Sequence, residues 1–96
     1  MNIHLTEHAR KRTAQRCIPE VLIDLILKYG SDFESRTGTQ IRALNDRMSK
    51  KEVSKELFSM GIKPRDPWWD TYLVVTHYGV VITVGHRFRR IKKKFH

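Results

Sequence analysis

Apolar residues recur at the spacing of one helical face between residues 19 and 29. The residues of this face are Val21, Leu22, Leu25, Ile26 and Tyr29. Pro19 suits the first turn of a helix, and Gly30 suits its end. The pattern therefore predicts an amphipathic helix over residues 19–29 that supplies much of the core.

Two further helices are predicted with weaker apolar faces. Thr6 can cap a helix that runs from residue 7 to about residue 16. Ser49 and Glu52 have the spacing of a capping box, with apolar residues at helical spacing behind them. Gly61 is typical of the end of that helix.

Strands are predicted where β-branched and aromatic residues gather. The strongest are residues 71–77 and 80–88, joined by a turn at Tyr78-Gly79, and the apolar run 80–84 indicates a central strand. Residues 32–36 and 39–44 predict a hairpin, and residues 3–5 a short opening strand. Residues 63–70 should form a loop, with Trp68 and Trp69 either stacking on bases or, preferably, anchoring it to the core.

These elements predict a single α+β domain over residues 1–96. Its N-terminal helices should pack on a small antiparallel β-sheet, with a helix inserted between strands. The inserted helix and its loop would occupy residues 45–69, and residues 89–96 would form a basic tail.

The net charge of the chain and its distribution indicate a class of binding partner. The chain has 19 Lys and Arg against 10 Asp and Glu, a net charge of +9. One basic cluster lies in the first helix, and the other is a C-terminal run without acids. They comprise Arg10, Lys11, Arg12 and Arg16, then Arg87, Arg89, Arg90, Lys92, Lys93 and Lys94. Clustered charge of this kind favours a nucleic acid, and RNA is the predicted partner, although a charge that serves only solubility is the alternative.

Cellular location follows from what the chain lacks. Cys17 is the only cysteine, so no internal disulfide can form. The N-terminus has no apolar signal-peptide core, and Asp24 interrupts the longest apolar stretch. We expect a cytoplasmic protein that does not span a membrane.

Two histidines stand next to arginines. His8, Arg12 and Arg16 share one helical face, and His86 and Arg87 follow a predicted buried strand. Histidine can exchange a proton near neutral pH and arginine can hold a phosphate, so these groups suit RNA cleavage. The alternatives are a solvated basic face and a strand end whose tail only attracts RNA.

A metal site has little support. His4 and His8 have ligand spacing, but His4 should precede the helix, and no cysteine pair or acidic cluster completes a set. We predict neither a metal nor another cofactor.

The opening Thr6-x-His8-Ala9-x-x-Arg12-x3-Arg16-x-Ile18 resembles the start of a widespread small bacterial family. That family is a domain of uncharacterised function grouped with the RelE-like toxins, in the barnase–EndoU–colicin–RelE (BECR) ribonuclease superfamily. The segments 72–76 and 80–87 look like its two final strands. The segment 48–69 is longer than the short connection that is usual at this point in the family.

The resemblance implies helices on an antiparallel sheet and a metal-independent ribonuclease, often the toxin of a toxin–antitoxin pair that a partner antitoxin inhibits. His8 and Arg12 carry over from the family motif. The leading hypothesis is an endoribonuclease that directs a ribose 2′-hydroxyl onto the adjacent phosphate. His8 and His86 would be base and acid in either order, and Arg12 and Arg87 would stabilise the transition state. The RNA-binding residues would be Lys11, Arg16, Arg89, Arg90, Lys92, Lys93 and Lys94. The alternative is a non-catalytic nucleic-acid-binding or protein-interaction module.

Overall fold

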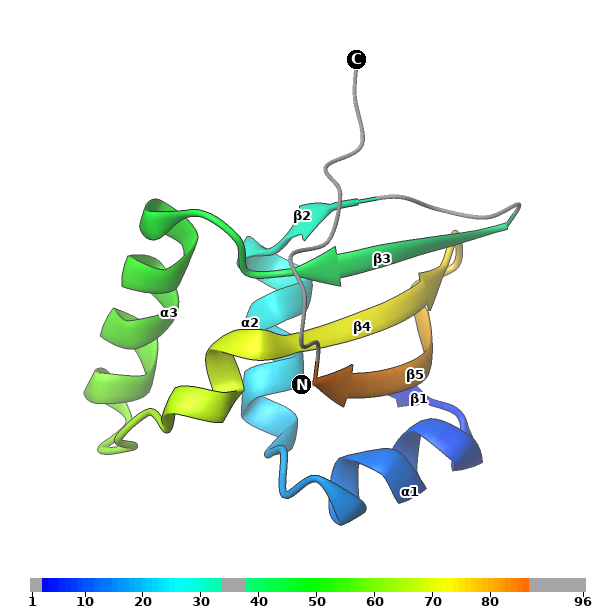
Figure 1. The fold of residues 1–96 in the computed structure, drawn as a ribbon, viewed down its shortest axis with the longest axis horizontal. Coiled ribbons are helices and arrows are strands. Elements are labelled where there is room, and N and C mark those ends of the chain that lie inside the picture. The colour runs from blue at the N-terminus through cyan, green and yellow to red at the C-terminus, as the bar shows by residue number, and fades with distance from the viewer. Residues whose placement is uncertain (1–2, 34–37, 87–96) are drawn as a thin grey trace.

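The fold of the chain is known from a computed structural model, which describes residues 3–33 and 38–86 (Figure 1). Two helices follow a short first strand, and a third helix lies between the third and fourth strands along the chain. In chain order the elements are β1 (His4–Leu5), α1 (Glu7–Gln15), α2 (Glu20–Tyr29), β2 (Ser31–Asp32), β3 (Thr39–Ala43), α3 (Arg47–Ser59), the 3-10 helix η1 (Asp66–Asp70), β4 (Thr71–Thr76) and β5 (Val80–His86).

The five described strands form one sheet in the order β1-β5-β4-β3-β2. The α+β class is confirmed, and so is the helix inserted between strands. The prediction of a wholly antiparallel sheet is wrong, because β1 pairs with β5 in parallel, His4 opposite Val80 and Leu5 opposite Val81. A two-residue strand has too few positions to show a pattern, and its partner lies at the far end of the sequence.

The core lies between α2 and the sheet (Figure 1). Leu22, Ile23 and Ile26 of α2 have no exposed surface, and Leu25 is 2% exposed. Strands β4 and β5 contribute Leu73, Val75, Val81 and Val84 to the same cluster. The predicted core helix is confirmed, although Ile23 extends its buried surface beyond the predicted face. Of the helices in the described part of the chain, none is long and apolar enough to cross a bilayer.

Both predicted hairpins are present among the described residues. Strands β4 and β5 pair on either side of the turn at Tyr78 and Gly79, and β2 pairs with β3, although residues 34–37 of that hairpin lie outside the description. The register between β4 and β5 shifts so that Ile82 has no partner on β4. This bulge brings Val81 and Val84 to the same side of the sheet although three positions separate them. The predicted central strand is confirmed in β5, which lies between β1 and β4.

The start of α3 differs from the predicted one. Asp46 is the N-terminal cap, and its carboxylate accepts the backbone N–H of Ser49 at 2.6 Å. The capping-box prediction, with Ser49 as the cap, is therefore wrong. A carboxylate at this position binds the free N–H groups and also interacts favourably with the helix dipole, which a serine hydroxyl does less well. The predicted end is confirmed, since Gly61 follows the helix with φ 75°.

The predicted loop 63–70 contains η1 and brings one tryptophan into the core. Trp68 is 8% exposed, and Trp69 packs against the core from its edge. Of the two interpretations of these aromatics, anchoring is confirmed for Trp68. Asp66-Pro67 at the start of η1 suits a short helical turn, since proline needs no N–H there.

A polar contact joins α2 to α3 at the edge of the core. The Tyr29 hydroxyl donates to Glu56 Oε2 at 2.6 Å, and Lys28 Nζ lies 3.6 Å from the same oxygen. The hydrogen bond from Tyr29 and the charge of Lys28 lower the pKa of Glu56, and the hydrogen bond to Glu56 raises the pKa of Tyr29. The ionised carboxylate and the neutral phenol are thus the forms that the fold favours.

We expect this contact to make folding stability depend on pH. The folded-state pKa of Glu56 lies below the ordinary unfolded value of about 4.3, so its contribution is present above that pH and is lost as the pH falls through the folded pKa. Wild-type protein should therefore lose more stability than Glu56→Gln between about pH 7 and about pH 3, measured by urea midpoints. Glu52→Gln is the control, because Glu52 pairs only with Lys55, at 3.9 Å on the surface. If the urea midpoints of wild type and Glu56→Gln differed by the same amount at both pH values, Glu56 would not be the source of the pH dependence.

Candidate nucleic-acid interface

Helix α1 is joined to β5 through Thr6, the residue that caps the N-terminus of the helix. Thr6 donates its backbone N–H to Val81 O at 3.0 Å and its hydroxyl to Ile82 O at 3.3 Å. The same hydroxyl accepts the N–H of Ala9, which confirms the predicted cap. From this point α1 and β5 run in the same direction (Figure 1). The side of α1 that faces β5 is therefore fixed at its start.

The inner stripe of α1 ends in an arginine. Ala9 is fully buried and Thr13 is 9% exposed, with the Thr13 hydroxyl donating to Ala9 O at 2.7 Å. Arg16 follows Thr13 by three positions and is therefore on the same stripe, and Arg12 flanks it. Both arginines are half-buried, and the Nε atom of each is buried without a hydrogen-bond partner. A buried N–H without an acceptor is costly, so these two groups favour an incoming acceptor.

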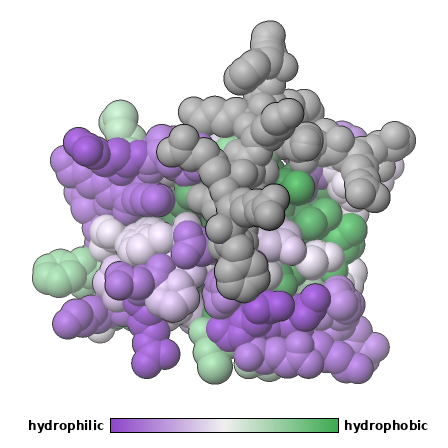
Figure 2. Space-filling model, in the orientation of Figure 1, coloured by the Kyte–Doolittle hydropathy of each residue, from purple (hydrophilic) through white to green (hydrophobic). Residues whose placement is uncertain are grey.

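The cations of α1 take part in no ion pair within residues 3–33 and 38–86. The ion pairs formed there are elsewhere: Lys28 with Glu56, Arg42 with Asp32, and Lys55 with Glu52. Arg10 and Lys11 are exposed. Figure 2 shows a continuous hydrophilic surface over this helix, at the lower right. The predicted basic cluster thus forms one surface, and among the described residues none of its cations lies within ion-pair distance of an acid.

His86 ends β5 opposite Thr71, the first residue of β4. Directly opposed residues share one face of an antiparallel pair. Residues two positions apart on a strand also share a face, so Thr71 lies on the same face as the core residues Leu73 and Val75. The side chain of His86 therefore lies on the helix-covered face. His86 Nε2 and Thr71 Oγ1 are both buried without a hydrogen-bond partner, and Thr71 has no exposed surface.

Helix and strand geometry place His86 beside the last turn of α1. Four strand residues beyond Ile82 advance about 13 Å. Ten helical residues beyond Thr6 advance about 15 Å, which brings Arg16 level with His86. Arg12 lies about 6 Å before Arg16 along the helix axis. The topology therefore gathers Arg12, Arg16, Thr71 and His86 at one end of the α1–β5 contact, and we call these four residues the orphan cluster.

His8 lies at the other end of that contact. It is exposed and only two residues beyond Thr6, so it lies about 10 Å from His86 along their shared direction. The structure thus places the two predicted histidines on the same pair of elements but does not bring them together. Arg87, Arg89, Arg90, Lys92, Lys93 and Lys94 lie outside the described residues.

Thr71 is the member of the cluster that the sequence did not indicate. As the polar first residue of an apolar strand it resembles an ordinary strand end. Its importance depends on the register with β5, which places it opposite His86. A local pattern carries no register information, so only the tertiary structure identifies it.

Gly85 supports the neighbouring strand by allowing a close approach. A Cβ atom at this position would lie 3.0 Å from the Tyr72 ring and hydroxyl, directly across the β4–β5 pair. A glycine within a strand indicates either a bulge or a close approach; Gly85 marks the close approach, whereas the bulge lies at Ile82.

Comparisons with protein-family models, curated proteins and solved structures find no match for the chain. The resemblance to the RelE-like family therefore stays a prediction. Within residues 3–33 and 38–86, no three His, Cys, Asp or Glu side chains come together as a group that could hold a metal ion.

We expect Gly85→Ala to destabilise the fold by about 1–3 kcal/mol, because the added methyl group displaces the Tyr72 ring. Urea unfolding measures this cost. In a Tyr72→Ala background the ring is absent, so the same substitution should cost much less. Equal costs in both backgrounds would show that the two residues do not interact.

Proposed function

We propose that this protein binds RNA along α1 and cleaves it at the orphan cluster without a metal ion. The observation that carries the proposal is the set of buried, unpartnered polar atoms: Nε of Arg12, Nε of Arg16, Nε2 of His86 and Oγ1 of Thr71. Phosphate oxygens accept several hydrogen bonds and carry the charge that arginine recognises. A bound phosphodiester would satisfy groups that the fold itself leaves unsatisfied.

The chemistry that fits this arrangement is transfer of a phosphoryl group within RNA. His86 takes the proton of a ribose 2′-hydroxyl, and the 2′-oxygen attacks the adjacent phosphorus. The bond from phosphorus to the 5′-oxygen breaks, that oxygen takes a proton from solvent, and a 2′,3′-cyclic phosphate remains. Arg12 and Arg16 stabilise the charge on the phosphorane oxygens. His8, about 10 Å away, would contact a flanking nucleotide.

The toxin role rests on the sequence resemblance alone, as does an antitoxin protein as inhibitor. The charge distribution supports the RNA partner independently of that resemblance. Arg10, Lys11 and the C-terminal basic run would bind the RNA backbone. A non-catalytic RNA-binding module remains the competing function, and the exposure of His8 away from His86 favours it.

We expect the purified protein to cleave a single-stranded RNA oligonucleotide in excess EDTA and to leave cyclic phosphate ends. His86→Gln should slow cleavage by about 10²-fold or more, because the base is lost. Arg16→Lys keeps the charge but loses the Nε donor, and it should slow cleavage by about 10²-fold. Arg65→Gln is the control, since this exposed arginine lies before η1 and outside the site.

Two results would decide against cleavage at this site. Intact RNA with the wild-type protein, despite measurable binding, would leave the non-catalytic module. Cleavage at wild-type rate by His86→Gln would remove His86 from the reaction.

We expect RNA affinity to fall steeply with salt, because phosphate contacts release counterions. Lys11→Gln should weaken binding for all sequences alike and reduce the salt slope by about 0.7, the value for one single-strand phosphate contact. Anisotropy titrations at several salt concentrations measure this slope. An unchanged slope for Lys11→Gln, or an equal reduction for Arg65→Gln, would place the RNA elsewhere.

A further inference from the structure

An apolar groove lies at the end of α3, away from the orphan cluster. It has a volume of about 1050 Å³, and its lining includes Phe58, Ile62 and Pro64, with Lys55 and Lys63 at its sides. In Figure 1, α3 and α1 lie on opposite sides of the molecule, with α2 between them. The groove therefore belongs to a different surface from the proposed RNA site.

Of the apolar side chains at this groove, Ile62 packs against the core, whereas Phe58 projects into solvent. Helix α3 already buries Val53 and Leu57 in the core. Phe58 is nevertheless 83% exposed and Met60 49% exposed. Figure 2 shows apolar side chains projecting from a hydrophilic surface on the α3 side of the molecule. Exposed aromatic and methionine side chains beside a groove are typical of a protein interface.

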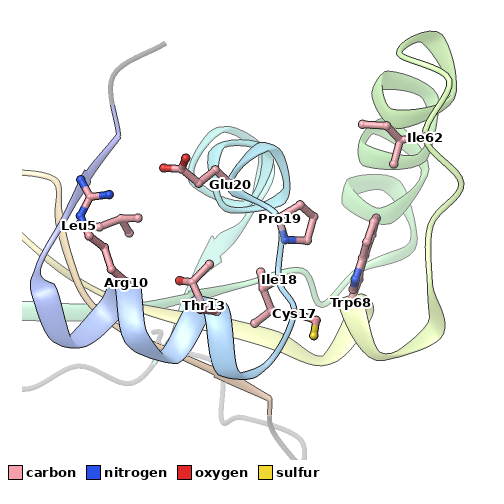
Figure 3. A pocket seen from close by; sticks show the side chains of 10 residues that line it. Leu5, Arg10, Thr13, Cys17, Ile18, Pro19, Glu20, Ile62 and Trp68 are labelled. Carbon is pink, nitrogen blue, oxygen red and sulfur yellow. The ribbon is translucent and has the colours of Figure 1, made fainter.

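A second apolar pocket continues from the first. It has a volume of about 440 Å³ and lies between α1 and α2, lined by Ile18, Pro19 and Trp68 among others (Figure 3). Arg10 and Glu20 also line it, so this pocket reaches the basic surface of α1 and carries one charge of each sign. Ile62 lines both pockets, so the two form one apolar surface. Two adjoining pockets suit a segment with several apolar side chains.

The charge around the groove is positive. No acid lines the groove itself, whereas Lys55 and Lys63 do. Residues 47–65 contain six Lys and Arg and two Asp and Glu. Of the two acids, Glu56 is engaged by Tyr29 and Lys28 on the α2 side. The other, Glu52, lies 3.9 Å from Lys55, an exposed pair of little strength.

We propose that this surface binds an acidic amphipathic segment of a partner protein. The apolar side chains of the segment would occupy the two pockets, and its carboxylates would face Lys55 and Lys63. Self-association is disfavoured, because two copies would bring like charges together. Nucleic acid is disfavoured because Phe58 is the only ring in the lining of the groove, where successive bases would need a series of stacking rings. This proposal stands whether or not the orphan cluster cleaves RNA.

The test uses a synthetic amphipathic peptide with Leu at helical spacing and Glu at the other positions. The matched probe has the same Leu positions with Lys in place of Glu. Anisotropy measures binding of both to the full chain, and amide chemical shifts locate it. We expect binding of the Glu peptide only, with shifts at residues 54–64 around the first pocket and at residues 13–20 and 68 around the second.

Phe58→Ala should weaken binding of the Glu peptide by about tenfold or more. Lys55→Glu combined with Lys63→Glu should abolish its salt dependence or its binding. Tyr78→Ala is the control, because Tyr78 is 93% exposed in the distant β4–β5 turn. RNA cleavage by Phe58→Ala should equal that of wild type, so failure of one proposal does not entail failure of the other.

Four results would overturn the proposal: no binding of the Glu peptide, equal binding of the Lys peptide, equal losses in Phe58→Ala and Tyr78→Ala, or RNA-induced shifts at residues 54–64 in place of α1. Concentration-dependent dimerisation that Phe58→Ala removes would also overturn it, in favour of a second copy as the occupant.

Discussion

Thr6 donates two hydrogen bonds to β5, one from its backbone and one from its hydroxyl, and these bonds determine where α1 lies. They continue the parallel pairing of β1 with β5. Because α1 then runs beside β5, its inner stripe of Ala9 and Thr13 is buried and its basic residues line the end of the strand. Arg16 thus comes level with His86, although 70 positions separate them in the sequence.

The same arrangement leaves buried polar atoms without hydrogen-bond partners at the proposed site. Buried donors without acceptors reduce stability, and natural folds retain few of them. Arg12, Arg16, Thr71 and His86 carry four buried polar atoms without partners, and helix and strand geometry brings these residues to one end of the α1–β5 contact. An anion at this point would gain hydrogen bonds without displacing any that the protein makes to itself. The α2–α3 contact, by contrast, is fully satisfied through Tyr29 and Glu56, and it contributes to the fold rather than to binding.

Local patterns predicted most of the elements because those elements depend on local chemistry. The face of α2, the cap at Thr6 and the β4–β5 hairpin all follow from residues close in the chain. The parallel pairing of β1, the Ile82 bulge and the partnership of Thr71 with His86 depend on residues far apart, and no periodicity encodes them. Asp46 was missed because two adjacent polar patterns competed for the start of α3, and only the backbone geometry decides between them. Of the candidate site, the sequence indicated His86 and the two arginines, whereas the separation of His8 from His86 required the fold.

Phosphate is proposed to bind at the α1–β5 end and a protein segment on the α3 side, and phosphate binding depends on the buried Nε groups of Arg12 and Arg16. The most direct measurement is an NMR titration with a 2′-deoxy oligonucleotide, which keeps the phosphodiester backbone but lacks the attacking hydroxyl. We predict that the Nε–H signals of Arg12 and Arg16 and the ring signals of His86 shift together and saturate together. Saturation of binding with those signals unchanged, while only exposed cations such as Lys11 respond, would contradict the account.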